Sequence, residues 1–176
     1  MVFRYCAWQD LLEIAAARNQ KPFLLALDGL EDPRNFGAIL RTAEAAGAHG
    51  VIIPKRRSVQ LNDTVMRTST GAAELVPVAQ AANINEVLQR LKKEGLWIAG
   101  LEADGGTDYR AADYTDGLTL VLGGEGRGLS RLTRTYCDFV VRIPLRGQIT
   151  SLNASVAAAL LLYEVVRQRD AAGLSR

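Results

Sequence analysis

The chain has 176 residues, of which 48% are hydrophobic and 23% are charged, and its formal net charge is +2. These values are typical of a globular domain with one buried core, and so mild a positive charge permits a nucleic-acid partner without requiring one. Because no apolar run approaches about 18 to 20 residues and the N-terminus lacks a signal-peptide pattern, we expect neither a membrane anchor nor export.

Residues 1–22 differ from the rest of the chain. They carry Arg4, Tyr5 and Trp8 and a short helical pattern over residues 10–18, without an obvious strand. We expect a leading linker and helix that pack on the core, or the remnant of a linker to another domain, followed by the main domain at residues 23–176.

Short apolar runs recur along the main domain, with amphipathic segments between them. The runs cover residues 23–27, 51–53, 75–78, 96–99, 118–122 and 139–143. Runs that are apolar on both faces and alternate with helical segments are typical of a parallel sheet that is covered on both sides. The pattern predicts an α/β fold with a mainly parallel sheet of about six strands and helices on both faces.

Capping residues and composition indicate where the helices lie. One helix begins at Asp32 or Asn35 and ends at Gly47, and another begins at Asn83 and ends at Gly95. The last helix, about residues 152–168, is apolar nearly all round, so it is buried on several sides. It packs either against a second subunit or in the centre of its own domain.

Two polar segments lie where ligands bind in an open α/β sheet, after the carboxyl ends of strands. Arg34, Asn35 and Arg41 can lie near one side of the first helical turns and converge on one site, although Asn35 can also be a cap and the arginines solvated surface. The glycine-rich turn 123–128 lets backbone approach a ligand. It fits neither a dinucleotide fingerprint nor a phosphate loop, and a tight turn without a ligand is the alternative.

The cysteines and the histidine form no catalytic or metal-binding pattern. Cys6 and Cys137 match no disulfide framework, so we expect reduced thiols and a cytoplasmic protein. His49 has no companion at ligand or triad spacing, and we expect a turn or surface residue. No cluster suggests a metal.

Three motifs stand in order along the chain. They are Asn35-x-Gly37-Ala38-x-x-Arg41, Gly124-Glu125-Gly126-x-Gly128-Leu129, and Ile143-Pro144-Leu145 through Gly147 to Ser151-Leu152-Asn153-x-Ser155. Together they resemble the motifs of the SpoU/TrmH family of RNA 2'-O-methyltransferases, of the SPOUT superfamily, over about residues 23–169. Residues 54–58 and 71–74 look more like the branch that methylates a guanosine ribose of large-subunit ribosomal RNA than the transfer RNA branch.

The resemblance implies methyl transfer from S-adenosylmethionine to a ribose 2'-hydroxyl, by a homodimer whose C-terminal region forms a deep trefoil knot. Physical reasoning alone would exclude a knot, because knots are almost absent among folds. The implied cofactor-binding residues are Gly100, Leu101, Gly123, Gly124, Ile143, Leu145, Ser151 and Leu152. Their small or apolar side chains suit binding through backbone groups.

The positions that match the family's catalytic set are Asn35, Arg41, Glu125, Ser151 and Asn153. Arg41 matches the usual base, yet deprotonating an arginine at pH 7 costs roughly 8 kcal/mol at about 1.36 kcal/mol per pKa unit. That is more than one general base usually supplies. We therefore favour a guanidinium that binds the adjacent phosphate and stabilises alkoxide charge. Glu125 would hold the loop or Arg41, while Asn35 and Asn153 orient substrate and loop.

Basic residues provide the predicted RNA contacts, although a basic run alone is usually a solvated face. They are Arg34, Lys55, Arg56, Arg57, Arg127, Arg131, Arg134 and Arg146. The ribosomal branch usually carries a small RNA-binding domain before the catalytic one. Here residues 1–22 precede the core, so the chain is either a catalytic domain of a longer protein or recognises RNA through the core alone.

Three other functions stay open. The chain can be a transfer RNA 2'-O-methyltransferase, a non-catalytic RNA-binding module of the same fold, or a Rossmann-type oxidoreductase. Arg41, Glu125 and Asn153 together argue against the binding module, because phosphate binding does not need a glycine-rich pocket beside a carboxylate.

Overall fold

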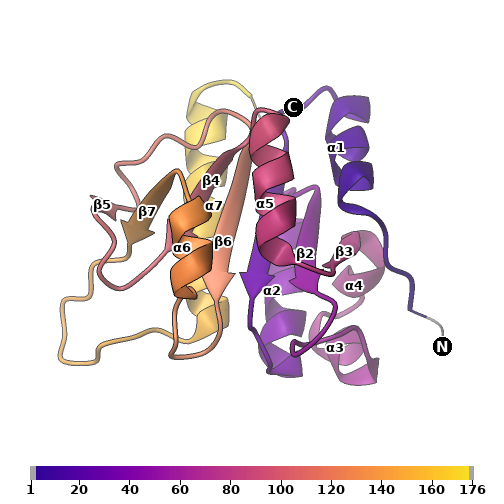
Figure 1. Cartoon of the computed structure of the whole chain (residues 1–176), viewed down its shortest axis with the longest axis horizontal. Helices are drawn as coiled ribbons and strands as arrows, with labels where there is room; N and C mark the ends of the chain where they lie inside the picture. Colours follow the sequence, from indigo (N-terminus) through magenta and orange to yellow (C-terminus); the bar gives the residue numbers. More distant parts are fainter. Residues whose placement is uncertain (1–2, 175–176) are drawn as a thin grey trace.

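The computed structural model describes residues 3–174, which form one parallel sheet with helices on both faces (Figure 1). The strands are β1 (Phe23–Asp28), β2 (Gly50–Pro54), β3 (Val78–Ala81), β4 (Trp97–Leu101), β5 (Thr107–Asp108), β6 (Leu118–Gly123) and β7 (Phe139–Arg142). They lie in the order β3-β2-β1-β6-β4-β7-β5. The predicted α/β class is confirmed, with seven strands where about six were expected.

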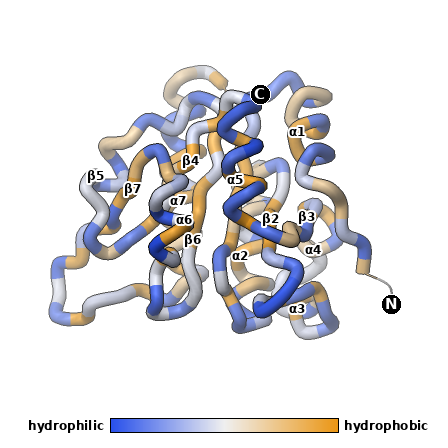
Figure 2. The backbone as a smooth tube through the Cα atoms, viewed as in Figure 1, coloured by the Kyte–Doolittle hydropathy of each residue, from blue (hydrophilic) through white to orange (hydrophobic). Residues whose placement is uncertain are grey.

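The helices are α1 (Trp8–Ala17), α2 (Pro33–Ala45), α3 (Asp63–Thr68), α4 (Ala72–Leu75), α5 (Ile84–Lys93), α6 (Arg131–Tyr136) and α7 (Ala154–Ala171). Alternate residues of β1 pack on opposite faces: Leu25 shares a core with α2 and α7, and Leu24 shares another with α1 and α5. Figure 2 shows hydrophobic residues along the central strands and hydrophilic residues on α5. Two cores sandwich the sheet, as helices on both faces require.

Two strands, β3 and β5, do not lie where the apolar runs predict strands. Leu75 belongs to α4 and is 67% exposed, and β3 begins three residues later at Val78. The helix ends because the residue before a proline is disfavoured in the α conformation: Val76, before Pro77, has φ −96° and ψ 116°. Strand β5 has two residues and pairs with β7 at the sheet edge. It is too short and polar to appear as an apolar run in the sequence.

Capping side chains begin the helices near the expected positions. Asp32 caps α2, because its carboxylate accepts a hydrogen bond from the Arg34 N–H at 2.8 Å. Asn83 caps α5 in the same way, and Asn153 caps α7. Since Asp32 is the cap of α2, the side chain of Asn35 is free for another contact.

His49 lies in the connection between α2 and β2, as expected of a turn residue, but it is buried at 2% exposure, so the expectation of a surface residue is wrong. Its Nδ1 accepts a hydrogen bond from the Phe23 N–H at 3.0 Å, and its Nε2 lies 2.8 Å from Oε1 of Gln20. This arrangement requires a neutral ring with the proton on Nε2. Burial, followed by the charges of Arg18 and Arg169, lowers the pKa of His49 to about 4.

The order of the strands creates a site at one edge of the sheet. The chain runs outward from β1 to β2 and β3, and then crosses to the other side, where β6 inserts between β1 and β4. The carboxyl ends of β4, β6 and β7 therefore meet at a reversal of strand order, where α/β proteins bind ligands. The trefoil knot implied by the resemblance stays a prediction. None of the helices in residues 3–174 is long and apolar enough to cross a membrane.

Candidate active site

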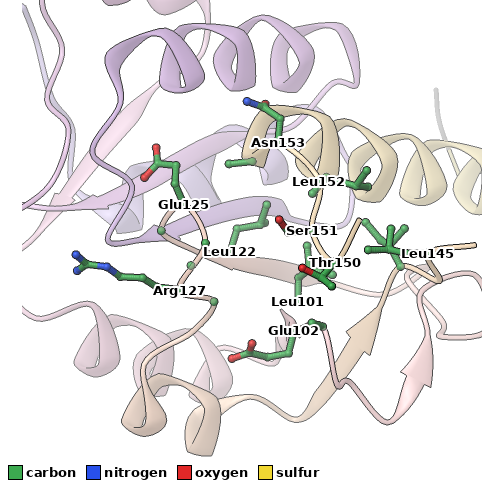
Figure 3. Close-up of a pocket in the computed structure, with 18 residues that line it drawn as sticks. Leu101, Glu102, Leu122, Glu125, Arg127, Leu145, Thr150, Ser151, Leu152 and Asn153 are labelled. Atoms are coloured by element: carbon green, nitrogen blue, oxygen red, sulfur yellow. The ribbon is translucent and has the colours of Figure 1, made fainter. Parts of the chain in front are cut away.

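A pocket of about 450 Å³ opens at the carboxyl ends of β4, β6 and β7 (Figure 3). It is lined by Leu101, Glu102, Ala103, Leu122, Gly123, Gly124, Glu125, Gly126, Arg127, Gly128, Ile143, Leu145, Thr150, Ser151, Leu152, Asn153, Ala154 and Ala157. Every cofactor position implied by the resemblance is in this set except Gly100. Segments that are distant in the sequence thus build one cavity.

Gly100 does not line the pocket, and its predicted contact with the cofactor stays a prediction. A Cβ atom at this position would overlap side-chain atoms of Leu129 and Cys137. Successive strand residues point to opposite faces, so Leu101 reaches the pocket and Gly100 does not. Close packing against the segment around α6 therefore explains this glycine without a ligand.

The glycine-rich loop needs its glycines for its own backbone. A Cβ at Gly123 would overlap the Gly128 carbonyl oxygen, and a Cβ at Gly124 would overlap the Gly29 carbonyl oxygen. Gly124 and Gly128 also form an antiparallel bridge. The loop folds back on itself, which leaves backbone groups on the pocket wall.

Glu125 joins this loop to the start of α2. Its Oε1 accepts hydrogen bonds from the Asp32 N–H at 3.1 Å and the Asn35 Nδ2 at 3.4 Å, and its Oε2 accepts one from the Glu31 N–H at 3.3 Å. Burial raises the pKa of Glu125, but the hydrogen bonds from backbone N–H groups and from Asn35 outweigh burial and leave the pKa below its usual value. The carboxylate is thus ionised at neutral pH and holds two loops together.

Ser151 and Asn153 lie in the segment before α7. The Oδ1 of Asn153 accepts hydrogen bonds from the Ser155 N–H at 2.9 Å and the Ser155 Oγ at 2.6 Å, so this side chain starts the helix at the pocket rim. Figure 3 shows Asn153 on the same side of the pocket as Glu125, with Ser151 near the middle. These two residues and Glu125 share one cavity.

Arg41 does not line the pocket of its own chain. It is exposed on α2, and within residues 3–174 its guanidinium has no hydrogen bond or ion pair. The predicted convergence of Arg34, Asn35 and Arg41 is therefore not found within one chain, since Asn35 alone reaches Glu125. The spacing allows the three residues to share a side of α2. Only the first turn of this helix, which carries Asn35, contacts the loop that lines the pocket, and Arg41 lies further along the helix.

Most of the basic residues predicted to contact RNA lie on the edge of the sheet that carries the pocket, while Arg134 forms an ion pair with Asp104 at 2.7 Å. Arg34, Lys55, Arg56, Arg57, Arg127 and Arg131 are exposed and follow the carboxyl ends of β1, β2 and β6. The loop with Lys55 is fixed to the β1 loop, because Ser58 Oγ and the Val59 N–H donate to the Leu30 carbonyl oxygen at 3.1 and 2.8 Å. Arg127 itself lines the pocket. Positive charge therefore lies beside the pocket, on the loops that follow β1, β2 and β6.

Glu102 is a pocket residue that the sequence motifs do not indicate. It follows β4 directly, and its Oε1 accepts a hydrogen bond from the Leu129 N–H at 2.9 Å. Only its position directly after the carboxyl end of a strand could have indicated from the sequence that it lies at a ligand site. Within the described residues, no group of three or more His, Cys, Asp or Glu side chains is arranged to hold a metal ion.

The fold and the pocket define an α/β protein that binds a small ligand at the carboxyl ends of adjacent parallel strands. A family profile described as the SpoU rRNA Methylase family matches residues 22–163. The chain is 48% identical over 171 residues to the putative TrmH family tRNA/rRNA methyltransferase YacO of Bacillus subtilis, covering 97% of this chain and 69% of YacO. The chain belongs to the SpoU family of RNA methyltransferases.

Solved structures give the same result. The SpoU methyltransferase AviRb of Streptomyces viridochromogenes, in complex with its cofactor AdoMet, superposes with a TM-score of 0.81 at 33% identity. The match covers 86% of this chain but 62% of AviRb, less than two thirds of its length. The A. aeolicus TrmH/SpoU tRNA modifying enzyme superposes with a TM-score of 0.80 at 27% identity. The match covers 94% of this chain and 85% of the A. aeolicus enzyme. These likenesses decide against a Rossmann-type oxidoreductase.

Proposed function

We propose that the chain is the catalytic domain of an S-adenosylmethionine-dependent RNA methyltransferase that modifies a ribose 2'-hydroxyl. The observation that carries this proposal is the pocket that three loops build at the carboxyl ends of β4, β6 and β7, in a member of the SpoU family. Residues 54–58 and 71–74 favour a guanosine of large-subunit ribosomal RNA as the substrate. A transfer RNA ribose is the second candidate, because relatives carry both names.

The lining of the pocket fits an adenosyl ligand. Its volume of about 450 Å³ falls in the range of small-molecule sites. The side chains of Leu101, Leu122 and Leu152 offer apolar surface to an adenine ring, and the glycine loop offers backbone hydrogen-bonding groups. When bound, S-adenosylmethionine supplies an electrophilic methyl group on a positively charged sulfur.

The protein groups then act mainly by positioning. Glu125 fixes the glycine-rich loop against α2, so that the pocket and the RNA-facing edge keep one relative position. The guanidinium of Arg41 binds the phosphate next to the reacting nucleotide and stabilises the developing alkoxide. Arg127 and the loop with Lys55 hold flanking phosphates.

We propose a homodimer that forms through α7 and the loop before it. Within one chain, apolar side chains on this surface remain 38–78% exposed: Leu145, Ile149, Leu152, Val156, Leu160 and Tyr163. Ala38 and Thr42 of α2 line a hollow with Val156, Leu160 and Tyr163, and Arg41 is adjacent to them on the same helix. A second copy on this surface would bury the apolar side chains and bring Arg41 to the interface.

The proposed location is the cytoplasm, where cysteines stay reduced. Cys6 and Cys137 are both free thiols, and burial is the main reason that the pKa of each is raised. Thiols of this kind are inert, which suits a structural role in a reducing compartment.

The first test is calorimetric titration with S-adenosylmethionine. We expect micromolar binding, which Leu152→Trp should abolish because the indole would fill the pocket. Leu75→Trp is the control, since Leu75 is exposed on α4, away from the pocket. Absence of binding by the unaltered chain would favour the non-catalytic RNA-binding module.

Methyl transfer is tested with radiolabelled cofactor on ribosomal and transfer RNA. A methylated 2'-hydroxyl cannot attack the adjacent phosphate, so alkali leaves the modified dinucleotide intact. We expect a labelled, alkali-resistant dinucleotide from ribosomal RNA. Label on a base, or in transfer RNA alone, would contradict the proposed target.

A further inference from the structure

Glu102 lines the pocket, yet the proposed reaction gives it no role. Its Oε1 accepts the hydrogen bond from the Leu129 N–H at 2.9 Å. Its Oε2 accepts none from any of residues 3–174. A Cβ at Gly128 would contact this oxygen, so Oε2 lies directly against the glycine-rich loop. One carboxylate oxygen of this pocket-lining residue thus has no hydrogen-bond partner within the described residues.

The other carboxylate in the lining is already occupied. Both oxygens of Glu125 accept hydrogen bonds from the β1–α2 segment, through Glu31, Asp32 and Asn35. The remaining charged side chain, Arg127, carries donors and no acceptor. Any hydroxyl group of a bound ligand that needs a charged acceptor must therefore use Glu102.

The two carboxylates mark different parts of the pocket. Glu125 and Asn153 lie on one side in Figure 3, and Glu102 lies on the opposite side, near Leu101. The transferred methyl group must face the RNA, and the proposed catalytic residues Asn35 and Glu125, which are in contact, mark that side of the pocket. The adenosyl part of the cofactor then extends toward Leu101 and Glu102.

We propose that Oε2 of Glu102 accepts a hydrogen bond from a ribose hydroxyl of the cofactor and selects ligands that carry it. This inference rests on the proposed function. A hydrogen bond to an ionised acceptor is stronger than one between neutral groups. A site built to bind a hydroxyl also rejects analogues that lack the hydroxyl, because its own polar group is left unpaired. Glu102 is therefore a specificity-determining residue.

The test is a double-mutant cycle by calorimetry. The ligands are S-adenosylhomocysteine, whose sulfur is neutral, and its 2',3'-dideoxy analogue, and the proteins are the unaltered chain and Glu102→Gln. The glutamine oxygen can still accept from the Leu129 N–H, so the loop keeps its support. Glu94→Gln is the control, since Glu94 is exposed at the end of α5.

We expect the unaltered chain to bind the dideoxy analogue about 10- to 100-fold more weakly than S-adenosylhomocysteine. In Glu102→Gln this difference should fall to about threefold or less, and in Glu94→Gln it should be unchanged. Equal weakening of both ligands by Glu102→Gln would show a purely structural role and overturn the inference.

Two further outcomes are decisive. If Glu102→Gln weakens S-adenosylmethionine far more than S-adenosylhomocysteine, the carboxylate senses the positive sulfur and the ribose assignment is wrong. If the unaltered chain binds neither ligand, the proposed cofactor site fails together with the inference. Intact binding without coupling between Glu102 and the hydroxyls overturns the role of Glu102 alone.

Discussion

At the scale of single residues, Arg41 has two candidate roles, to bind phosphate or to accept a proton. Its guanidinium is exposed on α2 and lies outside the pocket of its own chain. In the proposed dimer a second copy brings this residue to the interface, so its place within one chain does not separate a phosphate-binding role from that of a base. A variant that keeps the charge but changes the donor geometry separates them.

The variant Arg41→Lys distinguishes these roles. Lysine keeps the charge but loses the planar pair of donors, so we expect kcat to fall about 10- to 100-fold at every pH. The pH–rate profile should keep its shape. A profile whose inflection moves with the lysine would instead identify residue 41 as the base. Arg67→Lys, in an exposed position on α3, serves as the control.

His49 makes stability depend on pH. The folded state takes up a proton at about pH 4, and the unfolded state does so near pH 6.5. The free energy of unfolding should therefore fall as the pH decreases from 6.5 toward 4, by at most about 3 kcal/mol at about 1.4 kcal/mol per pKa unit. Chemical denaturation across this range measures the change.

His49→Gln removes the titrating group and should flatten that part of the profile. Glu125 adds a separate effect, because its lowered pKa stabilises the fold above about pH 4.5 and this contribution is lost below. An identical slope between pH 6.5 and 4.5 in both proteins would show that His49 is not the source.

At the scale of elements, the glycine-rich loop depends on backbone contacts. Gly123→Ala would place a methyl group on the Gly128 carbonyl, and backbone cannot move aside as a flexible side chain can. We expect loss of cofactor binding and a lower free energy of unfolding, by about 1–3 kcal/mol. Gly147→Ala is the matched control, because a Cβ there meets no atom within 4 Å. Cofactor affinity is measured by calorimetry and stability by thermal denaturation. If Gly123→Ala and Gly147→Ala changed both quantities equally, this explanation of the loop would be contradicted.

Helix α7 shows why an apolar pattern can have two meanings. Ala158, Leu161 and Val165 are buried in the core of the chain, while Val156 and Tyr163 are each 48% exposed. The sequence indicated burial all round and left open whether a second subunit or the domain itself supplied it. One face packs on the sheet and the other has no partner within the described chain, so both interpretations apply to different faces.

At the scale of the whole molecule, this exposed face predicts self-association. Leu160→Glu would place a charge in the proposed interface, so we expect the mass in solution to fall from dimer to monomer, measured by light scattering after gel filtration. Leu75→Glu changes an equally apolar but remote exposed side chain and should leave the mass unaltered. A monomeric unaltered chain, or a dimeric Leu160→Glu variant, would refute the proposed interface.

Local sequence alone determined much of the molecule. Apolar runs located most of the strands, and capping at Asn83 depended on neighbouring residues alone. The tertiary structure decided the rest: the contact of Glu125 with Asn35, the place of Glu102, the orientation of Gly100 and the exclusion of Arg41 from the pocket. The physical reason is that β6 inserts between β1 and β4, so that loops distant in sequence become neighbours through strand order, which no local pattern specifies.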